Sequence, residues 1–178
     1  MNKPISSNQI GLFPPIHLWP TPFKRLLSLY LLMQTIGLLC GLLLVGLISQ
    51  NNISGLQEHY RGQIQTDPLE IPDSTPKPLK SMLITTHTHM MPLALLFFVM
   101  GVLILHVSVN IPFKNILAFE PIIALGTTFG GLWLMRYVHS YFIILVLISS
   151  VLLYGSYFIQ VGLLMYELIF IKPQSTKN

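Results

Sequence analysis

Residues 82–109 read MLITTHTHMMPLALLFFVMGVLILHVSV and contain no Asp, Glu, Lys or Arg. An uncharged, mainly apolar run of about 18 residues or more is typical of a transmembrane helix. Inside a bilayer the backbone amides and carbonyls must find partners within their own segment, and a helix provides them. The run lacks the regular alternation of polar and apolar residues that a membrane barrel strand needs. We therefore predict a membrane-spanning helix here.

Three further apolar runs are long enough to cross a bilayer, at residues 26–49, 116–134 and 141–171. A polar stretch, residues 50–81, separates the first run from the second and holds four of the six acidic residues. The remaining links are short, and short links make neighbouring helices antiparallel. The predicted fold is all-α: an integral membrane up-down four-helix bundle with one polar outer loop. Residues 1–178 form a single membrane domain, in which residues 1–25 are a tail before the first helix.

The composition excludes several classes of protein. Of the 178 residues, 52% are hydrophobic and 9% charged, whereas soluble domains carry about 25% charged residues. Cys40 is the only cysteine, which excludes a disulfide scaffold and a thiolate cluster built by this chain alone. The basic residues behind the net charge of +4 are scattered and mostly flank apolar runs. We therefore expect a lipid bilayer as partner and no nucleic acid.

The Lys and Arg residues also predict an orientation. Six of them fall on the side of the two termini and four on the other side, and Lys24 and Arg25 directly precede the first helix. Basic residues are enriched on the cytoplasmic side of membrane proteins. We predict a multi-pass protein of the bacterial inner membrane with both termini cytoplasmic and residues 50–81 in the periplasm.

Four of the six histidines are predicted to lie at the periplasmic face: His59, His87, His89 and His139. Imidazole is a common ligand of haem iron, copper and zinc. His106 follows His87 by 19 residues, about 28 Å along a helix, so it cannot share their site. The four histidines therefore define the predicted cofactor site.

Haem b is the first candidate cofactor. Its iron needs two axial imidazoles, and His87 or His89 on one helix with His139 on another would supply them. Arg136 would then pair with a haem propionate, because guanidinium groups bind carboxylates strongly. The predicted haem-binding residues are thus His87, His89, His139 and Arg136.

A metal ion is the alternative to haem, and copper suits the residues best. His87 and His89 lie about 200° apart on a regular helix, so only one of them would face the bundle axis. If Pro92 lies in the first helical turn, the helix starts near Met90 and both histidines lie on an extended lead-in. They would then bind one ion, with His59 as a further ligand and Met90 or Met91 as soft thioether ligands for copper.

A second group of polar residues is expected at the cytoplasmic face, where His106, Glu120 and Glu167 fall. Glu120 directly precedes Pro121, a natural helix start, so we expect Glu120 to cap that helix. The fourth run carries a series of polar residues: Ser149, Ser150, Tyr154, Ser156, Tyr157 and Gln160. Such a stripe usually supplies hydrogen bonds between helices. A quinone pocket would use the same groups, and both alternatives stay open.

Residues 58–62 read EHYRG, residues 86–89 read THTH and residues 131–137 read GLWLMRY. This pattern resembles that of small uncharacterised bacterial four-helix inner-membrane proteins, over about residues 55–165. The resemblance implies a bacterial inner-membrane protein that works beside respiratory or redox proteins. In outline the chain also resembles four-helix membrane cytochromes b. Those place paired histidines closer together on one helix than His87 and His106, so the likeness implies at most one haem.

The predicted function is that of a membrane redox protein with a haem b or metal site near the periplasmic face. It would transfer electrons to or from other membrane or periplasmic redox subunits. The alternative is a non-catalytic accessory subunit of a larger respiratory or redox membrane complex. The usual enzyme signatures, such as G-x-S-x-G, H-E-x-x-H and C-x-x-C, are absent from the sequence.

Overall fold

The computed structural model describes residues 14–63 and 74–171. Its helices are α1 (Thr21–Ile48), α2 (Ile53–Arg61), α3 (Leu79–Leu105), α4 (Ile111–Tyr137) and α5 (Ile143–Phe170), with short 3-10 helices η2 (Ile16–Leu18) and η3 (Ser140–Phe142). Among these residues there are no strands, and four helices are long and apolar enough to cross a membrane. The prediction of an all-α membrane bundle is confirmed.

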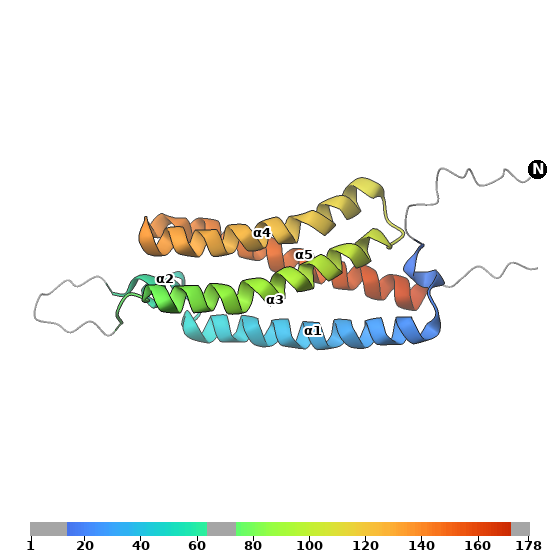
Figure 1. Ribbon diagram of the computed structural model, residues 1–178, viewed down its shortest axis with the longest axis horizontal. Helices are drawn as coiled ribbons and strands as arrows, with labels where there is room; N and C mark the ends of the chain where they lie inside the picture. Colours follow the sequence, from blue (N-terminus) through green and yellow to red (C-terminus); the bar gives the residue numbers. More distant parts are fainter. Residues whose placement is uncertain (1–13, 64–73, 172–178) are drawn as a thin grey trace, which may run out of the picture.

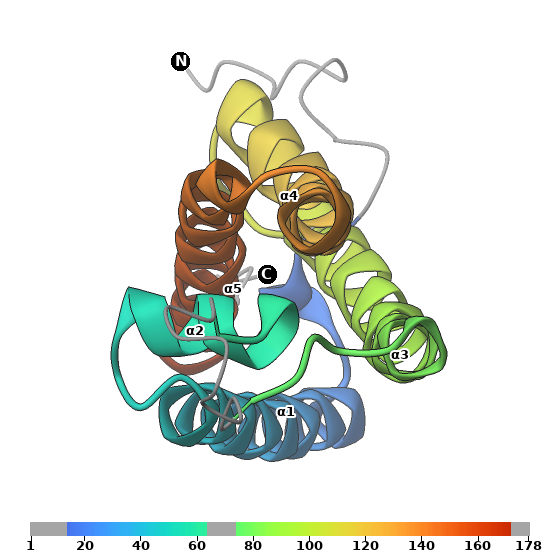
Figure 2. The same ribbon diagram turned by 90° about the vertical axis from the view of Figure 1, so that its left-hand side faces the viewer.

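The four long helices lie along the long axis of the molecule, with α1 and α4 running in one direction and α3 and α5 in the other (Figure 1). Seen from one end, they surround a common core in the order α1, α3, α4, α5, and α2 lies across that end (Figure 2). We call this the α2 end, and we call the opposite end, where η2 lies, the η2 end. Both ends of the described chain, Pro14 and Ile171, lie at the η2 end, as the even number of spans requires.

The short helix α2 was not predicted: it lies within residues 50–81, which were expected to form a single polar loop. Asn52 caps it by accepting a hydrogen bond from the backbone N–H of Gly55, and Gly62 ends it with a φ of 77°. Positive φ at a helix C-terminus favours glycine. The first part of the predicted polar outer loop is therefore helical, while residues 64–73 lie outside the described residues.

Three of the long helices begin earlier than predicted, and α3 differs least, with a start at Leu79 instead of residue 82. α1 starts at Thr21 instead of residue 26, and α4 starts at Ile111 instead of residue 116. Pro112 stands in the first turn of α4, where a missing N–H costs no hydrogen bond. The side chain of Asn110 accepts the N–H of Phe113 at 3.0 Å and caps the helix. Residues 111–115, predicted as a link, therefore belong to α4.

Buried residues from α3, α4 and α5 make up most of the core, and α1 is the least buried span. A Cβ atom on Gly101 of α3 would lie 2.9 Å from the carbonyl oxygen of Ala118 on α4. Glycine is needed at this position because the two backbones approach so closely.

Polar residues of α5 bond to the neighbouring helices, which is one of the two alternatives that the sequence left open. Thr128 of α4 donates to Ser149 at 2.8 Å, and the hydroxyls of Thr35 and Tyr157 lie 3.0 Å apart. A hydrogen bond between membrane helices satisfies groups that lipid cannot. These bonds tie α5 to α4 on one side and to α1 on the other.

Pro121 stands inside α4 and does not start it, so the expected capping role of Glu120 is wrong. Proline has no N–H for the carbonyl of the residue four positions earlier, here Leu117. The side-chain amide of Gln160, which is fully buried, donates to that carbonyl at 2.5 Å. A neighbouring helix thus satisfies the group that the proline leaves free.

Candidate functional site

The predicted site histidines fall on or near the α2 end. α3 is helical from Leu79 onward and Pro92 lies inside it. The helix predicted from residue 82 is present, the alternative that started it near Met90 is wrong, and no extended lead-in brings His87 and His89 together. On the regular helix they point in nearly opposite directions. Both side chains are exposed, so neither faces the bundle axis as one of them was expected to do.

His87 lines an open groove of about 390 Å³ on the outer side of α3. The lining residues are Leu83, Thr86, His87, Met90, Met91 and Ala94. Residues at positions i, i+3 and i+4 share one helix face, and His87, Met90 and Met91 have this spacing. The groove therefore gathers one imidazole and two thioethers among otherwise mainly apolar side chains.

The groove lies near the boundary of the predicted bilayer. Thr86, the residue before His87, accepts a hydrogen bond at 2.9 Å from the indole Nε1 of Trp133 on α4. Trp133 belongs to the last turns of α4, and Tyr137 ends that helix. Tryptophan and tyrosine are enriched where a membrane meets water. His87 is thus placed at the level where water and membrane partners both reach it.

His89 bonds to its own helix. Its Nδ1 donates to the carbonyl oxygen of Thr85 at 3.0 Å, one turn earlier. That bond leaves Nε2 on the exposed side of the ring. His89 is therefore held in one orientation, on a different side of α3 from the methionine groove.

His59 belongs to α2, not to a loop as the sequence suggested. Its Nε2 accepts from Nζ of Lys77 at 3.3 Å, and its ring stands edge-on to Tyr60. Lys77 also lies over the ring of Tyr60, 4.6 Å from its centroid. Burial, and secondly the charge of Lys77, lower the pKa of His59. His59 is thus a neutral acceptor for Lys77 in the neutral pH range.

Arg136 and Arg61 fasten the α2 end. Arg136 donates from Nε to the carbonyl oxygen of Lys77 at 3.0 Å and lies over the ring of Tyr137. Arg61 donates to the carbonyl oxygen of Met135 at 2.7 Å. Arg136 was predicted to pair with a haem propionate. In the structure its hydrogen bond to Lys77 joins the end of α4 to the segment that leads into α3.

His139 lies between α4 and η3 and is exposed. Its Nδ1 accepts the backbone N–H of Tyr141 at 3.2 Å, and the two rings stack with centroids 4.6 Å apart. Across residues 14–63 and 74–171, no three His, Cys, Asp or Glu side chains gather as a metal-binding group. The histidines predicted to act together are thus spread over separate surfaces of this end.

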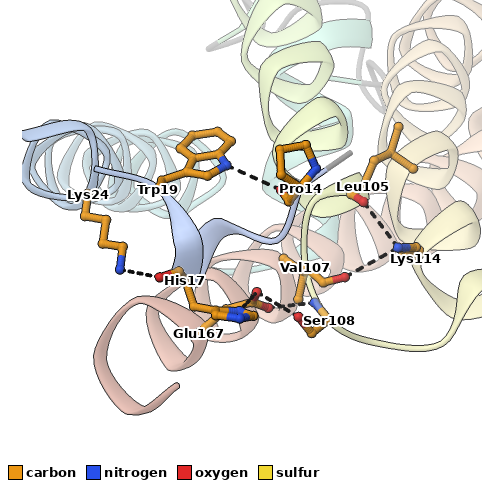
Figure 3. A network of polar contacts seen from close by, with 9 residues as sticks. All are labelled: Pro14, His17, Trp19, Lys24, Leu105, Val107, Ser108, Lys114 and Glu167. Atoms are coloured by element: carbon orange, nitrogen blue, oxygen red, sulfur yellow. Dashed lines mark hydrogen bonds and ion pairs between the residues drawn. The ribbon is translucent and has the colours of Figure 1, made fainter. Parts of the chain in front are cut away.

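A polar network lies at the η2 end (Figure 3), and of its residues only Glu167 was predicted to belong to a polar group there. Glu167 of α5 is 1% exposed and its carboxylate accepts three hydrogen bonds. They come from Nδ1 of His17 at 3.0 Å, the backbone N–H of Ser108 at 2.7 Å and its hydroxyl at 3.0 Å. Lys24 donates to the carbonyl oxygen of His17 at 2.6 Å. The network joins η2, α1, α5 and the link between α3 and α4.

The expected group of His106, Glu120 and Glu167 does not form as one cluster. The ring of His106 meets Trp19 edge-on at 5.2 Å, and its carbonyl oxygen accepts the N–H of Ile16 at 3.2 Å. Glu120 bonds to Ser156 farther inside the bundle. The partner of Glu167 that sequence reasoning missed is His17, which had no predicted role.

With the fold and both polar ends described, the class of protein follows: a multi-pass helical membrane domain. The chain belongs to the family Aq_1264_TM, described as a transmembrane helical domain, whose model matches residues 50–176. The match covers α2, α3, α4 and α5 and leaves α1 outside it. No curated protein and no solved structure matches the chain.

The lowered pKa of His59 predicts a pH-dependent docking of α2. An undocked His59 binds a proton near its ordinary pKa of 6.5, before the docked one does. Docking is therefore at full strength above this pH and weakens as the pH falls below it. We expect hydrogen–deuterium exchange of α2 amides, corrected for intrinsic rates, to be faster at about pH 5.5 than at about pH 7.5.

The matched control for this prediction is His59→Gln, which keeps an acceptor for Lys77 but does not titrate. Its corrected exchange rates in α2 should be the same at both pH values. Equal pH dependence in the wild type and in His59→Gln would show that another group controls the docking.

Proposed function

We propose that the chain is an integral membrane redox protein that binds a copper ion at the groove formed by His87, Met90 and Met91. The observation that carries the proposal is the position of these three side chains on one face of α3, where they line the same groove. Thioether sulfur selects Cu(I), and imidazole binds copper in both oxidation states. The donor set is therefore one nitrogen and two sulfur atoms.

The helix geometry supports such a site. Side chains three and four residues apart on a helix have Cβ atoms about 5–6 Å from each other. Methionine has three flexible side-chain torsions, which lets both sulfur atoms turn toward an ion near His87. Met91 is 62% exposed, so an ion or a partner protein reaches the groove from outside the bundle.

The site would serve electron transfer. A copper ion held by His87, Met90 and Met91 would supply one-electron chemistry between Cu(I) and Cu(II), with a redox centre of a partner subunit as the electron acceptor or donor. The predicted orientation puts the α2 end in the periplasm of a bacterial inner membrane, with both termini cytoplasmic. The partner is then a periplasmic or membrane redox subunit that docks at this end.

An anaerobic titration tests the proposal. Detergent-purified protein, competed against a coloured Cu(I) chelator, should bind one Cu(I) per chain. Met90→Leu and Met91→Leu should each weaken Cu(I) binding at least about tenfold. Even the loss of a residue that only hydrogen-bonds to a metal ligand lowers metal affinity by about that factor. Met33→Leu is the matched control, since Met33 of α1 is exposed but lies outside the groove.

The absorption spectrum of the same sample tests the haem b reading. A haem between two imidazoles would use His139 with His87 or His89, and Nε2 of His139 is the nitrogen left for iron. Bands of reduced b-type haem in gently purified protein would favour haem over copper. Protein that contains no haem and takes up no stoichiometric metal would contradict both cofactors.

The second candidate function is an accessory subunit of a larger membrane complex. The observation that favours it is the exposure of Thr88 and His89 on α3, away from the copper groove. Polar groups on the outer surface of a membrane helix are better covered by protein than by lipid. Under this function, His89→Leu should reduce assembly with the partner subunits while the binding of copper at His87 stays unchanged.

A further inference from the structure

Glu120 is a carboxyl group at membrane depth. The hydroxyl of Ser156 donates to its Oε2, and Ser156 stands midway along α5. At 1.5 Å per residue, this position is about 20 Å from either end of that helix, close to the centre of a bilayer. Ionisable groups at such depth are costly, and in membrane proteins they mark functional sites by default.

The second oxygen of this carboxyl group has no protein partner. Oε1 of Glu120 is buried and accepts no hydrogen bond from the part of the chain that the structure describes. A buried acceptor without a donor is unfavourable, and each such group in a native structure calls for a cause. A ligand that brings a hydrogen-bond donor would supply the missing partner.

Glu120 also lines a groove of about 620 Å³ between α4 and α5. This volume lies in the range of small-molecule sites, about 300–1,000 Å³. Its outer walls are apolar side chains that are more than half exposed, among them Phe119, Ile123 and Ile148. Because this surface faces lipid, the groove is reached from within the membrane and not from water.

We propose that this groove binds a membrane-dissolved hydroquinone, with one phenolic hydroxyl donating to Glu120. The apolar walls suit an aromatic ring and an isoprenoid tail, and the carboxylate suits a hydroxyl donor. An acyl chain of a lipid fills the same walls but leaves Oε1 without a donor. The reduced form of the ligand should therefore bind more tightly than the quinone, which has only acceptor oxygens.

The test is a titration of the full-length protein in quinone-free nanodiscs with a decyl-substituted hydroquinone and, separately, with its oxidised quinone. The wild type should prefer the reduced form. Glu120→Leu should weaken hydroquinone binding at least about tenfold, which corresponds to the loss of one hydrogen bond. Thr127→Val is the control in the same groove, because the Thr127 hydroxyl bonds within its own helix, to the carbonyl of Ile123.

A second variant keeps the test decisive if Glu120→Leu does not fold. Ile148→Trp leaves Glu120 and Ser156 in place and fills the groove, so binding of the hydroquinone should be lost. Equal affinity for the two forms, or binding that survives Ile148→Trp, would overturn the proposal.

Dimerisation through this face without hydroquinone binding would also overturn it and would assign the groove to a second copy of the chain. Since no step involves His87, failure of the copper site leaves this result unaffected.

Discussion

Replacing Glu167 with Ala should destabilise the bundle more than any other single change at the η2 end. The carboxylate is buried and accepts hydrogen bonds from His17 and twice from Ser108. Removing it leaves these donors without a partner and leaves a space in the core. Each buried donor left without a partner costs about 1–3 kcal/mol. The free energy of unfolding, measured by SDS titration in mixed micelles, should therefore fall by about 3–5 kcal/mol.

Two variants serve as comparisons for this prediction. Glu167→Gln keeps the size of the side chain and one acceptor oxygen, so its loss should be smaller. Glu58→Ala removes an exposed carboxylate of α2 and should change the free energy of unfolding by less than about 0.5 kcal/mol. If Glu167→Ala unfolds as easily as Glu58→Ala, the network at the η2 end contributes no stability.

His87→Ala should lower the Cu(I) affinity at least about a hundredfold. Losing a residue that only hydrogen-bonds to a metal ligand lowers metal affinity by up to about a hundredfold, and losing the ligand itself should cost at least as much. The substitution removes the only nitrogen donor of the groove. The fold should survive, because His87 is exposed and the helices are held together by other residues. Competition with a Cu(I) chelator measures the affinity, and circular dichroism checks the helix content.

His89→Ala is the matched control, since it removes an exposed histidine two residues away on another side of α3. It should bind Cu(I) as the wild type does. An equal loss of affinity in both variants would mean that the two histidines bind one ion together. Unchanged affinity in His87→Ala would remove this residue from the site altogether.

The architecture was predictable because the bilayer restricts it. Runs of about 20 apolar residues have one stable conformation in lipid, and short links leave one topology. The four spans and the antiparallel order followed from these two facts. Hydrogen bonds between helices were one of two alternatives for Ser149 and Tyr157, since polar groups inside a membrane bundle need partners.

Helix boundaries were less predictable where proline was involved. Pro121 was read as a helix start, and one alternative put Pro92 in a first helical turn, but both lie inside spans. Gln160 of α5 satisfies the carbonyl that Pro121 leaves free. The alternative for Pro92 put His87 and His89 on a supposed extended segment. The signals for α2, Asn52 before it and Gly62 after it, were present in the sequence and were overlooked.

Contacts between distant residues were beyond prediction from one sequence. The pair of His17 and Glu167 joins residues 150 positions apart, and it depends on the rotation of α5 about its axis. The same holds for the proposed copper donors: the composition shows the histidines and methionines, but only the helix phase groups His87 with Met90 and Met91. The sequence thus listed the candidate ligands without their arrangement.

X-ray absorption at the copper edge of the Cu(I)-loaded protein tests the copper site most directly. The spectrum should fit one nitrogen donor from His87 and two sulfur donors from Met90 and Met91. In Met90→Leu and Met91→Leu one sulfur donor should disappear. A copper shell made of nitrogen and oxygen alone, or protein that retains no copper, would contradict the site.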